Sequence, residues 1–184
     1  MFEDDFGRKC CFTGYRPSKF PFSMDREDKD YKKFENALID KILKLSKDNC
    51  RIFYSGMAMG FDIIAAEIVL MLKEAYDTPL KLVCVLPFEN QSETYTSFWR
   101  RRYEKILRQA DEVIVLSKEY YQGCYQDRNI YMVDKCDYVL TWYDGKQGGT
   151  RNTLDYAAEK GRHIFNANAK GSENFGVQTS IEIL

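Results

Sequence analysis

The sequence RIFYSGMAMGFDIIAAEIV occupies residues 51–69 and decides the fold. An apolar run ends at Ser55 and Gly56, a short stretch ends at a second glycine, Gly60, and a long apolar run with helical spacing follows. A buried strand, a glycine-containing turn and a helix in this order are typical of one unit of a parallel α/β sheet. The turn itself fits two interpretations, a phosphate-binding loop or a tight connection.

The same alternation of strand and helix extends along the chain in both directions. Strand-like apolar runs are expected at residues 9–15, 51–56, 80–88, 111–117, 137–144 and 163–168. Helical spacing predicts helices at 29–47, 61–76, 96–110, about 127–136 and 150–160. Strands that alternate with helices predict an α/β fold, a Rossmann-like three-layer sandwich with a mainly parallel sheet.

The chain is predicted to form a single domain. Its 184 residues suit one domain of ordinary size, and no internal repeat or linker divides them. The expected core covers about residues 9–168, within a domain that spans 1–184. The tail from Ala169 has weak periodicity, and no function is attached to it.

Charge and composition exclude several classes of protein. The 27 basic and 28 acidic residues give a net charge of -1, so nucleic acid is an unlikely partner, although a local basic patch stays compatible with this balance. No run is long and apolar enough to span a bilayer, and the acidic opening MFEDDFG lacks the order of a secretory signal. We therefore expect a cytoplasmic protein with no membrane partner.

The cysteines predict neither disulfides nor a metal site. Six cysteines are present without a C-x-x-C pair, and His163 is the only histidine. Reduced thiols are the default in a cytosolic chain, and Cys10, Cys11 and Cys84 fall in apolar runs where small buried side chains are expected. Zinc binding and catalysis by a Cys-His or Ser-His pair are therefore poorly supported.

Distinctive polar residues collect in the loops that follow the expected strands. These loops read TGYRP, SGMAMGFD, PFENQ, EYYQGCYQDRN and DGKQGGTRNT. In an open parallel sheet a ligand lies outside the carboxyl ends of the strands, near the point where the strand order reverses. The sequence therefore predicts a ligand site along this edge.

The two glycine-containing loops differ in the chemistry that they offer. Asp62 would repel a phosphate at the start of its helix, so it is either a helix cap or an acceptor for sugar hydroxyls. Gly148 and Gly149 run into Thr150, which predicts a nest of backbone N–H groups, a cap and a hydroxyl donor for an anion. A flexible loop before a capped helix is the alternative.

Arg16 is a further candidate, and it also allows two interpretations. Its guanidinium can bind a phosphate through two N–H groups, or it can form a salt bridge to Asp62 or Glu67 in the neighbouring turn. Pro17 stiffens the turn in either case.

The segment after the fourth expected strand supplies donors and aromatic rings. Arg128 and Asn129 offer a second donor set near the start of a helix. Tyr120, Tyr121 and Tyr125 present either a flat surface for a base or a lid packed on the protein.

Several stretches follow one another along the chain: TGYRP, SGMAMGFDIIAAE, the proline and glutamine of LPFENQ, Trp99, ADEVIVLS, YQDRNIYMVDKCD and YDGKQGGTRNTLDYA. In this order and spacing they resemble the YpsA-like and YoqJ-like branch of the SLOG superfamily, which also contains Smf/DprA and the Lonely Guy phosphoribohydrolases. The resemblance covers about residues 10–168. It implies a Rossmannoid fold that binds a nucleotide or a nucleotide-derived ligand at the strand ends.

Together with the loop chemistry, the resemblance implies a set of ligand-binding residues: Thr13, Gly14, Arg16, Pro17, Ser55, Gly56, Met57, Gly60, Asp62, Pro87, Gln91, Trp99, Arg128, Asn129, Asp144, Gly148, Gly149 and Thr150. Tyr15 stands where relatives often carry histidine, which argues against histidine-dependent chemistry. Asp155 and Glu159 do not match the offset of the glutamate in the Lonely Guy motif, so that activity carries over weakly.

Three functions follow from these features. The first is a binding module, a sensor or adaptor for a nucleotide-like ligand such as ADP-ribose, with no certain cofactor. The second is a hydrolase that cleaves an N-glycosidic or phosphate bond, with Asp62 or Glu67 as general base. The third is single-stranded DNA binding through arginines and tyrosines. A homodimer is compatible with the aromatic loops.

Overall fold

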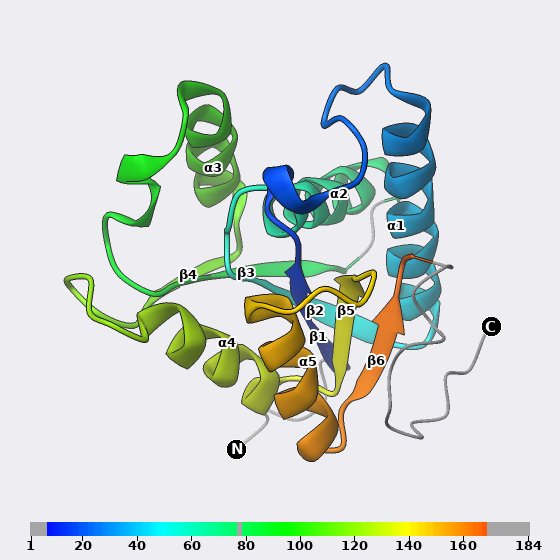
Figure 1. The fold of residues 1–184 in the computed structure, drawn as a ribbon. Coiled ribbons are helices and arrows are strands. Elements are labelled where there is room, and N and C mark those ends of the chain that lie inside the picture. The colour runs from blue at the N-terminus through cyan, green and yellow to red at the C-terminus, as the bar shows by residue number, and fades with distance from the viewer. Residues whose placement is uncertain (1–6, 77–78, 169–184) are drawn as a thin grey trace.

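The structure is a computed structural model that describes residues 7–76 and 79–168 (Figure 1). Its strands are β1 (Arg8–Gly14), β2 (Cys50–Ser55), β3 (Lys81–Leu86), β4 (Glu112–Val115), β5 (Tyr138–Trp142) and β6 (His163–Asn166). Its α-helices are α1 (Lys29–Lys47), α2 (Phe61–Tyr76), α3 (Ser97–Gln109), α4 (Cys124–Lys135) and α5 (Gly149–Glu159), and two short 3-10 helices are η1 (Pro17–Lys19) and η2 (Gln91–Thr94). The expected tail lies outside the described residues.

The six strands form one sheet in the order β4-β3-β2-β1-β5-β6, and every neighbouring pair is parallel. Figure 1 shows α1, α2 and α3 on one face of the sheet and α4 and α5 on the other. The predicted Rossmann-like three-layer fold is confirmed, with an entirely parallel sheet. Strands β2, β3 and β4 follow β1 in chain order toward one edge of the sheet. The chain then crosses back through α4, and β5 and β6 lie on the other side of β1. The strand order therefore reverses between β1 and β5.

The hydrophobic pattern explains why α2 lies at the centre of its layer. Nine of its residues are buried, from Phe61 to Leu72, whereas α1 buries one stripe at helical spacing and exposes its charged face. β1 supplies the middle of the core with Cys10, Cys11 and Phe12, all at most 1% exposed. All six cysteines are free and buried, including Cys10, Cys11 and Cys84, whose burial the sequence predicted.

Helix boundaries agree with the periodicity except at α4. This helix begins at Cys124, three residues before the expected start near Asp127. Gly123 precedes it with φ +98°, a left-handed conformation that glycine adopts without steric cost. The extra turn carries a tyrosine and a glutamine but little apolar periodicity, so the pattern alone did not predict it.

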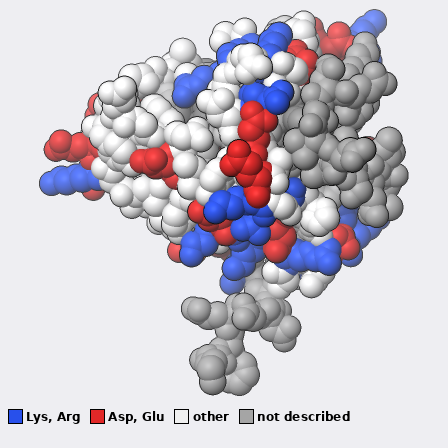
Figure 2. Space-filling view, turned by 60° about the horizontal axis from the view of Figure 1, so that its bottom comes forward, with Lys and Arg blue, Asp and Glu red and all other residues white. Residues whose placement is uncertain are grey.

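None of the helices that the structure describes combines the length and the apolar character needed to cross a bilayer. On the face that Figure 2 turns toward the viewer, acidic and basic side chains lie beside one another. This interspersed pattern agrees with the balanced charge of the whole chain.

Candidate functional site

A cavity of about 220 Å³ opens at the carboxyl ends of β1 and β2, beside the point where the strand order reverses. Its walls come from the loop after β1 and from the first turns of α2, α4 and α5. The lining residues are Thr13, Gly14, Tyr15, Arg16, Lys19, Ala58, Asp62, Tyr125, Arg128, Asn129, Gly149 and Thr150. Eight of the eighteen predicted ligand-binding residues are therefore brought together: Thr13, Gly14, Arg16, Asp62, Arg128, Asn129, Gly149 and Thr150.

The turn between β2 and α2 is held by its own side chains and does not line the cavity except at Ala58 and Asp62. The buried Ser55 donates its hydroxyl to the Asp62 carbonyl at 3.0 Å and accepts the Met57 N–H at 3.2 Å. Met57 is fully buried and has φ +57°. Ser55 and Met57 therefore build the turn, and the Ser55 hydroxyl and the Met57 N–H are occupied within it.

The two glycines of this turn are required by packing. A Cβ at Gly56 would lie 2.1 Å from Arg128 Nη1, and a Cβ at Gly60 would lie 2.5 Å from the Tyr15 carbonyl oxygen. Gly60 also has φ +95°, which disfavours any residue with a Cβ. The structure therefore supports the interpretation of this turn as a tight connection. Gly149 differs, because a Cβ there would meet nothing within 4 Å.

Arg128 is the buried cation of the cavity and is only 4% exposed. Its Nε donates to Asn129 Oδ1 at 2.8 Å, and its Nη1 donates to the carbonyl of Gly56. These bonds occupy two of the five N–H groups of the guanidinium. Burial lowers the pKa of Arg128, and the nearby Asp62 carboxylate opposes that change.

Asp62 is the carboxylate of the cavity and is 5% exposed. Its Oδ2 accepts the Ala58 N–H at 3.5 Å, so it faces the loop before α2. Burial raises the pKa of Asp62 to about 6, although Arg128, the Ala58 N–H and Arg16 act in the opposite direction. At neutral pH the group is mostly an anionic acceptor, and mild acid protonates it.

The start of α5 leaves backbone donors without a side-chain cap. Gly148 is the N-cap residue and makes no side-chain cap hydrogen bond. Thr150 donates its hydroxyl to the Gly14 carbonyl at 3.1 Å, so it ties α5 to β1 and is not the cap that the sequence predicted. The first-turn N–H groups and the positive end of the helix dipole suit an anion.

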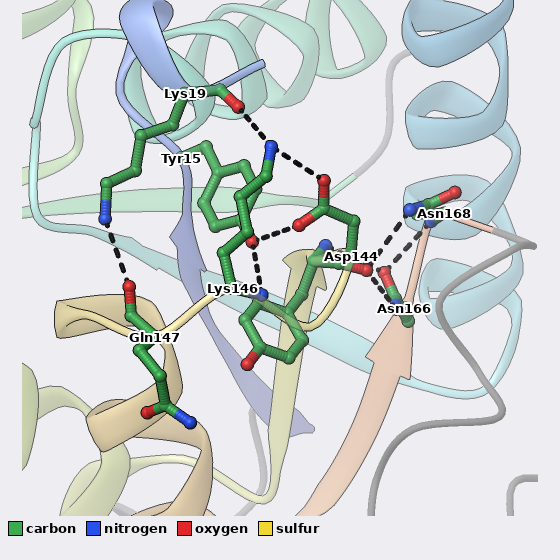
Figure 3. Close-up of polar contacts among 8 residues, drawn as sticks. Tyr15, Lys19, Asp144, Lys146, Gln147, Asn166 and Asn168 are labelled. Carbon is green, nitrogen blue, oxygen red and sulfur yellow. Dashed lines mark hydrogen bonds and ion pairs between the residues drawn. The ribbon is translucent and has the colours of Figure 1, made fainter. Parts of the chain in front are cut away.

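A cluster around Tyr15 holds the loop between β5 and α5 (Figure 3). The Tyr15 hydroxyl donates to Asp144 Oδ1 at 2.5 Å and accepts the Lys146 N–H at 3.3 Å. Lys146 Nζ lies 3.1 Å from Asp144 Oδ2 and donates to the carbonyl of Lys19 at 3.2 Å. Asp144, a predicted ligand-binding residue, is therefore engaged in positioning the glycine loop.

The electrostatics of this cluster agree with its geometry. Burial raises the pKa of Tyr15 to about 12, and the hydrogen bond to Asp144 acts in the same direction. Burial alone would raise the pKa of Asp144, but the contacts with Tyr15 and Lys146 outweigh it and hold that pKa below its ordinary value. Tyr15 thus serves as a hydrogen-bond donor to Asp144.

Glu67 is not brought to the cavity. It accepts two hydrogen bonds from Arg102, at 2.8 and 2.6 Å, and lies 3.7 Å from Arg26. It lines a separate hollow of about 830 Å³ between α1, α2 and α3. Glu67 is therefore a structural partner of α3 rather than a second carboxylate beside Asp62.

Other predicted residues also support the walls or lie elsewhere. Gln91 donates to the Gly56 carbonyl at 3.0 Å. The ring centre of Trp99 lies 4.4 Å from the guanidinium carbon of Arg102. The remaining predicted residues outside the cavity lining are Pro17, Pro87 and Gly148. Among the described residues no group of three His, Cys, Asp or Glu side chains is placed to hold a metal ion.

In the described part of the chain, Arg16 forms neither of the two predicted salt bridges, to Asp62 or to Glu67. Glu67 is engaged by other arginines, and the guanidinium of Arg16 lies 5.7 Å from the ring centre of Tyr125. Arg16 is exposed and lines the cavity, so it is free to meet an anion there.

Sequence reasoning missed Lys19. Its side chain lines the cavity, and Nζ lies 2.6 Å from the position of a Cβ on Gly148. The signal was a lysine two residues after Pro17, in the loop that follows the first strand. Lys19 is the last residue of the short helix η1.

Comparison with known proteins places these features in a family. Residues 10–170 match the model of the YspA SLOG family. The SPbeta prophage-derived protein YoqJ of Bacillus subtilis (strain 168) is 30% identical over 133 residues, which cover 66% of this chain and 76% of that protein. A UPF0398 protein of Oceanobacillus iheyensis is 32% identical over 142 residues, which cover 75% of this chain and 74% of that protein.

Two solved structures share the fold. DNA processing protein A from Helicobacter pylori, whose structure describes single-stranded DNA binding, has a TM-score of 0.61 and 19% identity over 88% of this chain. DNA processing protein A from Streptococcus pneumoniae has a TM-score of 0.59 and 19% identity over 87% of this chain. The matched regions span 66% and 50% of those proteins. Because of these neighbours, the expectation that nucleic acid is an unlikely partner is not supported. The family model and the relatives agree, and the chain belongs to the YspA SLOG family.

Proposed function

We propose that the chain is a cytoplasmic binding protein, a sensor or adaptor, for a nucleotide or a nucleotide-derived ligand such as ADP-ribose. The observation that carries this proposal is Arg128, a buried guanidinium that lines the cavity and uses two of its five N–H groups within the described chain. Arg16 and Lys19 add two cations against the single carboxylate of Asp62. The six free cysteines fit a reducing compartment.

The cavity contains two kinds of polar group that suit the parts of a nucleotide. The uncapped first turn of α5 and the arginines suit phosphate oxygens, which accept hydrogen bonds from N–H donors. Asp62 suits hydroxyl groups of a sugar, because an ionised carboxylate only accepts. Phosphate binding is thus proposed at the start of α5, and sugar binding at the start of α2.

Thermal unfolding with a panel of ligands tests the proposal. A ligand at 100 times its dissociation constant adds about 2.7 kcal/mol to the free energy of unfolding. Nucleoside monophosphates, NAD and ADP-ribose form the panel, and inorganic phosphate is the reference. If no member raises the melting temperature and no small molecule copurifies, the proposal fails.

Substitution of Arg128 locates the site. Arg128→Lys keeps the charge but removes the planar fork, and we expect the best ligand to bind about 10-fold or more weakly, because hydrogen bonds to charged groups contribute about 1.5–3 kcal/mol. Arg101→Lys is the matched control, since Arg101 is exposed on α3 away from the cavity. Equal losses in both variants would contradict this location.

A hydrolase that acts on an N-glycosidic or phosphate bond is the second candidate, and Asp62 favours it. A carboxyl with a pKa of about 6 is close to the operating range of a general base. Incubation of the protein with nucleoside monophosphates, NAD and ADP-ribose, followed by chromatography, detects turnover. Product that forms equally with the wild type and Asp62→Asn would remove this role.

Single-stranded DNA binding is the third candidate. It is supported by the cations and tyrosines at the strand ends and by the fold shared with a protein that binds single-stranded DNA. The dependence of oligonucleotide affinity on salt concentration tests this candidate.

A further inference from the structure

Three aromatic rings form a cluster beside the charged cavity, and we call it the aromatic ledge. Phe88 follows β3, Tyr120 follows β4, and Tyr125 lies in the first turn of α4. The ring centre of Phe88 lies 5.6 Å from the ring centre of Tyr120 and 5.9 Å from that of Tyr125. Tyr120 is 62% exposed, so packing within the chain leaves most of this side chain in contact with solvent.

The ledge is continuous with the cavity. Tyr125 belongs to both, because it lines the cavity and contacts the other two rings. The guanidinium of Arg16 covers Tyr125 at 5.7 Å from the ring centre, which leaves Tyr120 as the open ring of the ledge. The cavity and the ledge therefore share one wall residue, Tyr125.

The sheet fixes the order of these features along its carboxyl edge. The start of α5 contacts the end of β1 through Thr150, Asp62 follows β2, and Phe88 follows β3. The distance from β1 to β3 is two strand spacings, or roughly 10 Å. Anion donors, a hydroxyl acceptor and an aromatic surface thus succeed one another in the order phosphate, sugar, base.

We propose that the aromatic ledge is the nucleobase subsite and that the ligand class is a 5′-nucleotide. This inference rests on the proposed function of the cavity. The base stacks on Tyr120, its sugar hydroxyls face Asp62, and its phosphate lies at Arg128 and the start of α5. Stacking on a tyrosine tolerates every base, so the ledge adds affinity for a nucleobase without selecting one.

Calorimetric titration of two ligands tests the subsite. Adenosine 5′-monophosphate contains the base, and ribose 5-phosphate lacks it. We expect Tyr120→Ala to weaken binding of the nucleotide roughly 5- to 150-fold and to leave binding of ribose 5-phosphate unchanged. Tyr120→Phe keeps the ring and should retain the affinity of the wild type.

Tyr76→Ala is the matched control. Tyr76 is 63% exposed, like Tyr120, but it ends α2 at the opposite edge of the sheet. Unchanged nucleotide affinity in Tyr120→Ala would overturn the subsite while the proposed function stands. Failure of both ligands to bind the wild type would instead overturn the proposed function and the subsite together. Loss of oligonucleotide binding in Tyr120→Ala, without any binding of the mononucleotide, would reassign the ledge to nucleic acid.

Discussion

Asp62 and Arg128 carry opposite charges, and both are almost fully buried. Burial of charged groups is costly, and no ion pair within 4.0 Å joins these two side chains in the described chain to offset it. Burial is the main cause of the raised pKa of Asp62. A ligand with hydroxyl donors and phosphate oxygens would satisfy both groups.

The first prediction concerns stability against pH. The pKa of Asp62 rises from 3.8 to about 6 in the folded state, a shift of about 2 units. The folded protein therefore binds a proton more tightly than the unfolded chain, so the free energy of unfolding falls as pH rises from about 4 to 6. Above pH 6 the full penalty, about 3 kcal/mol, is present. Asp62→Asn should stabilise the protein by up to this amount at pH 7.5 and hardly at all near pH 4.

Urea unfolding at the two pH values measures the difference. Asp40→Asn is the control, because Asp40 is exposed on α1 and should change stability little at either pH. A parallel pH dependence in the wild type and Asp62→Asn would show that the Asp62 carboxyl is not responsible.

The second prediction separates glycines that serve packing from a glycine that serves a ligand. Gly56→Ala should lower the free energy of unfolding by about 1–3 kcal/mol, because the new Cβ displaces the buried Arg128. Gly149→Ala should not destabilise the protein, since its Cβ meets open space in the first turn of α5. Instead it should weaken ligand binding by crowding the N–H donors. Urea unfolding and calorimetry measure the two effects, and a destabilised Gly149→Ala would contradict this assignment.

At the scale of elements, the loop between β5 and α5 is held by the side chain of Tyr15, which directly follows the neighbouring strand β1. Tyr15 reaches from the end of β1 to Asp144, and Asn166 at the end of β6 donates to the Tyr143 carbonyl at 2.9 Å. The start of α5 is therefore fixed from both neighbouring strands. This arrangement preorganises the backbone donors that a phosphate would meet.

The third prediction removes one of these supports. Tyr15→Phe loses the hydroxyl that donates to Asp144, and the free energy of unfolding should fall by about 1–2 kcal/mol. The pKa of Asp144 is lowered in the fold, so this stabilisation is present above the ordinary pKa and is lost as pH falls through the lowered value. Tyr121→Phe is the matched control, because Tyr121 makes the same bond to Asp127 at an exposed site. Equal losses in both variants would contradict a special role for Tyr15.

Periodicity predicted the helices and strands well, because residues that are buried on one face of an element recur at regular spacing in the sequence. The expected helices at 29–47 and 61–76 coincide with α1 and α2. Contacts between distant residues have no such regular spacing: Arg128 bonds to Gly56, 72 positions away. That contact explains the glycine, and only the folded chain reveals it. The same limit applies to Lys19, which reaches the cavity through η1.

At the scale of the molecule, the strand order accounts for the place of the site. The reversal between β1 and β5 separates the loops on either side and opens a crevice between them. The sequence predicted a ligand site along the carboxyl edge of the sheet, where the cavity lies. It also predicted a phosphate at Gly149, where an added Cβ would meet nothing within 4 Å. The predicted homodimer stays a prediction. Nucleotides and single-stranded DNA remain competing proposals for the ligand.

The fourth prediction distinguishes these ligands through salt. Three cations line the cavity, Arg16, Lys19 and Arg128. If a single strand binds only there, it displaces counterions from about three phosphates, and the slope of log K against log salt is about -2. We expect a short oligonucleotide to show this shallow slope and to be displaced by the best mononucleotide, because both occupy one cavity. Fluorescence anisotropy at several salt concentrations measures it. A much steeper slope, unaffected by the mononucleotide, would demonstrate a broader basic surface that binds DNA independently of the cavity.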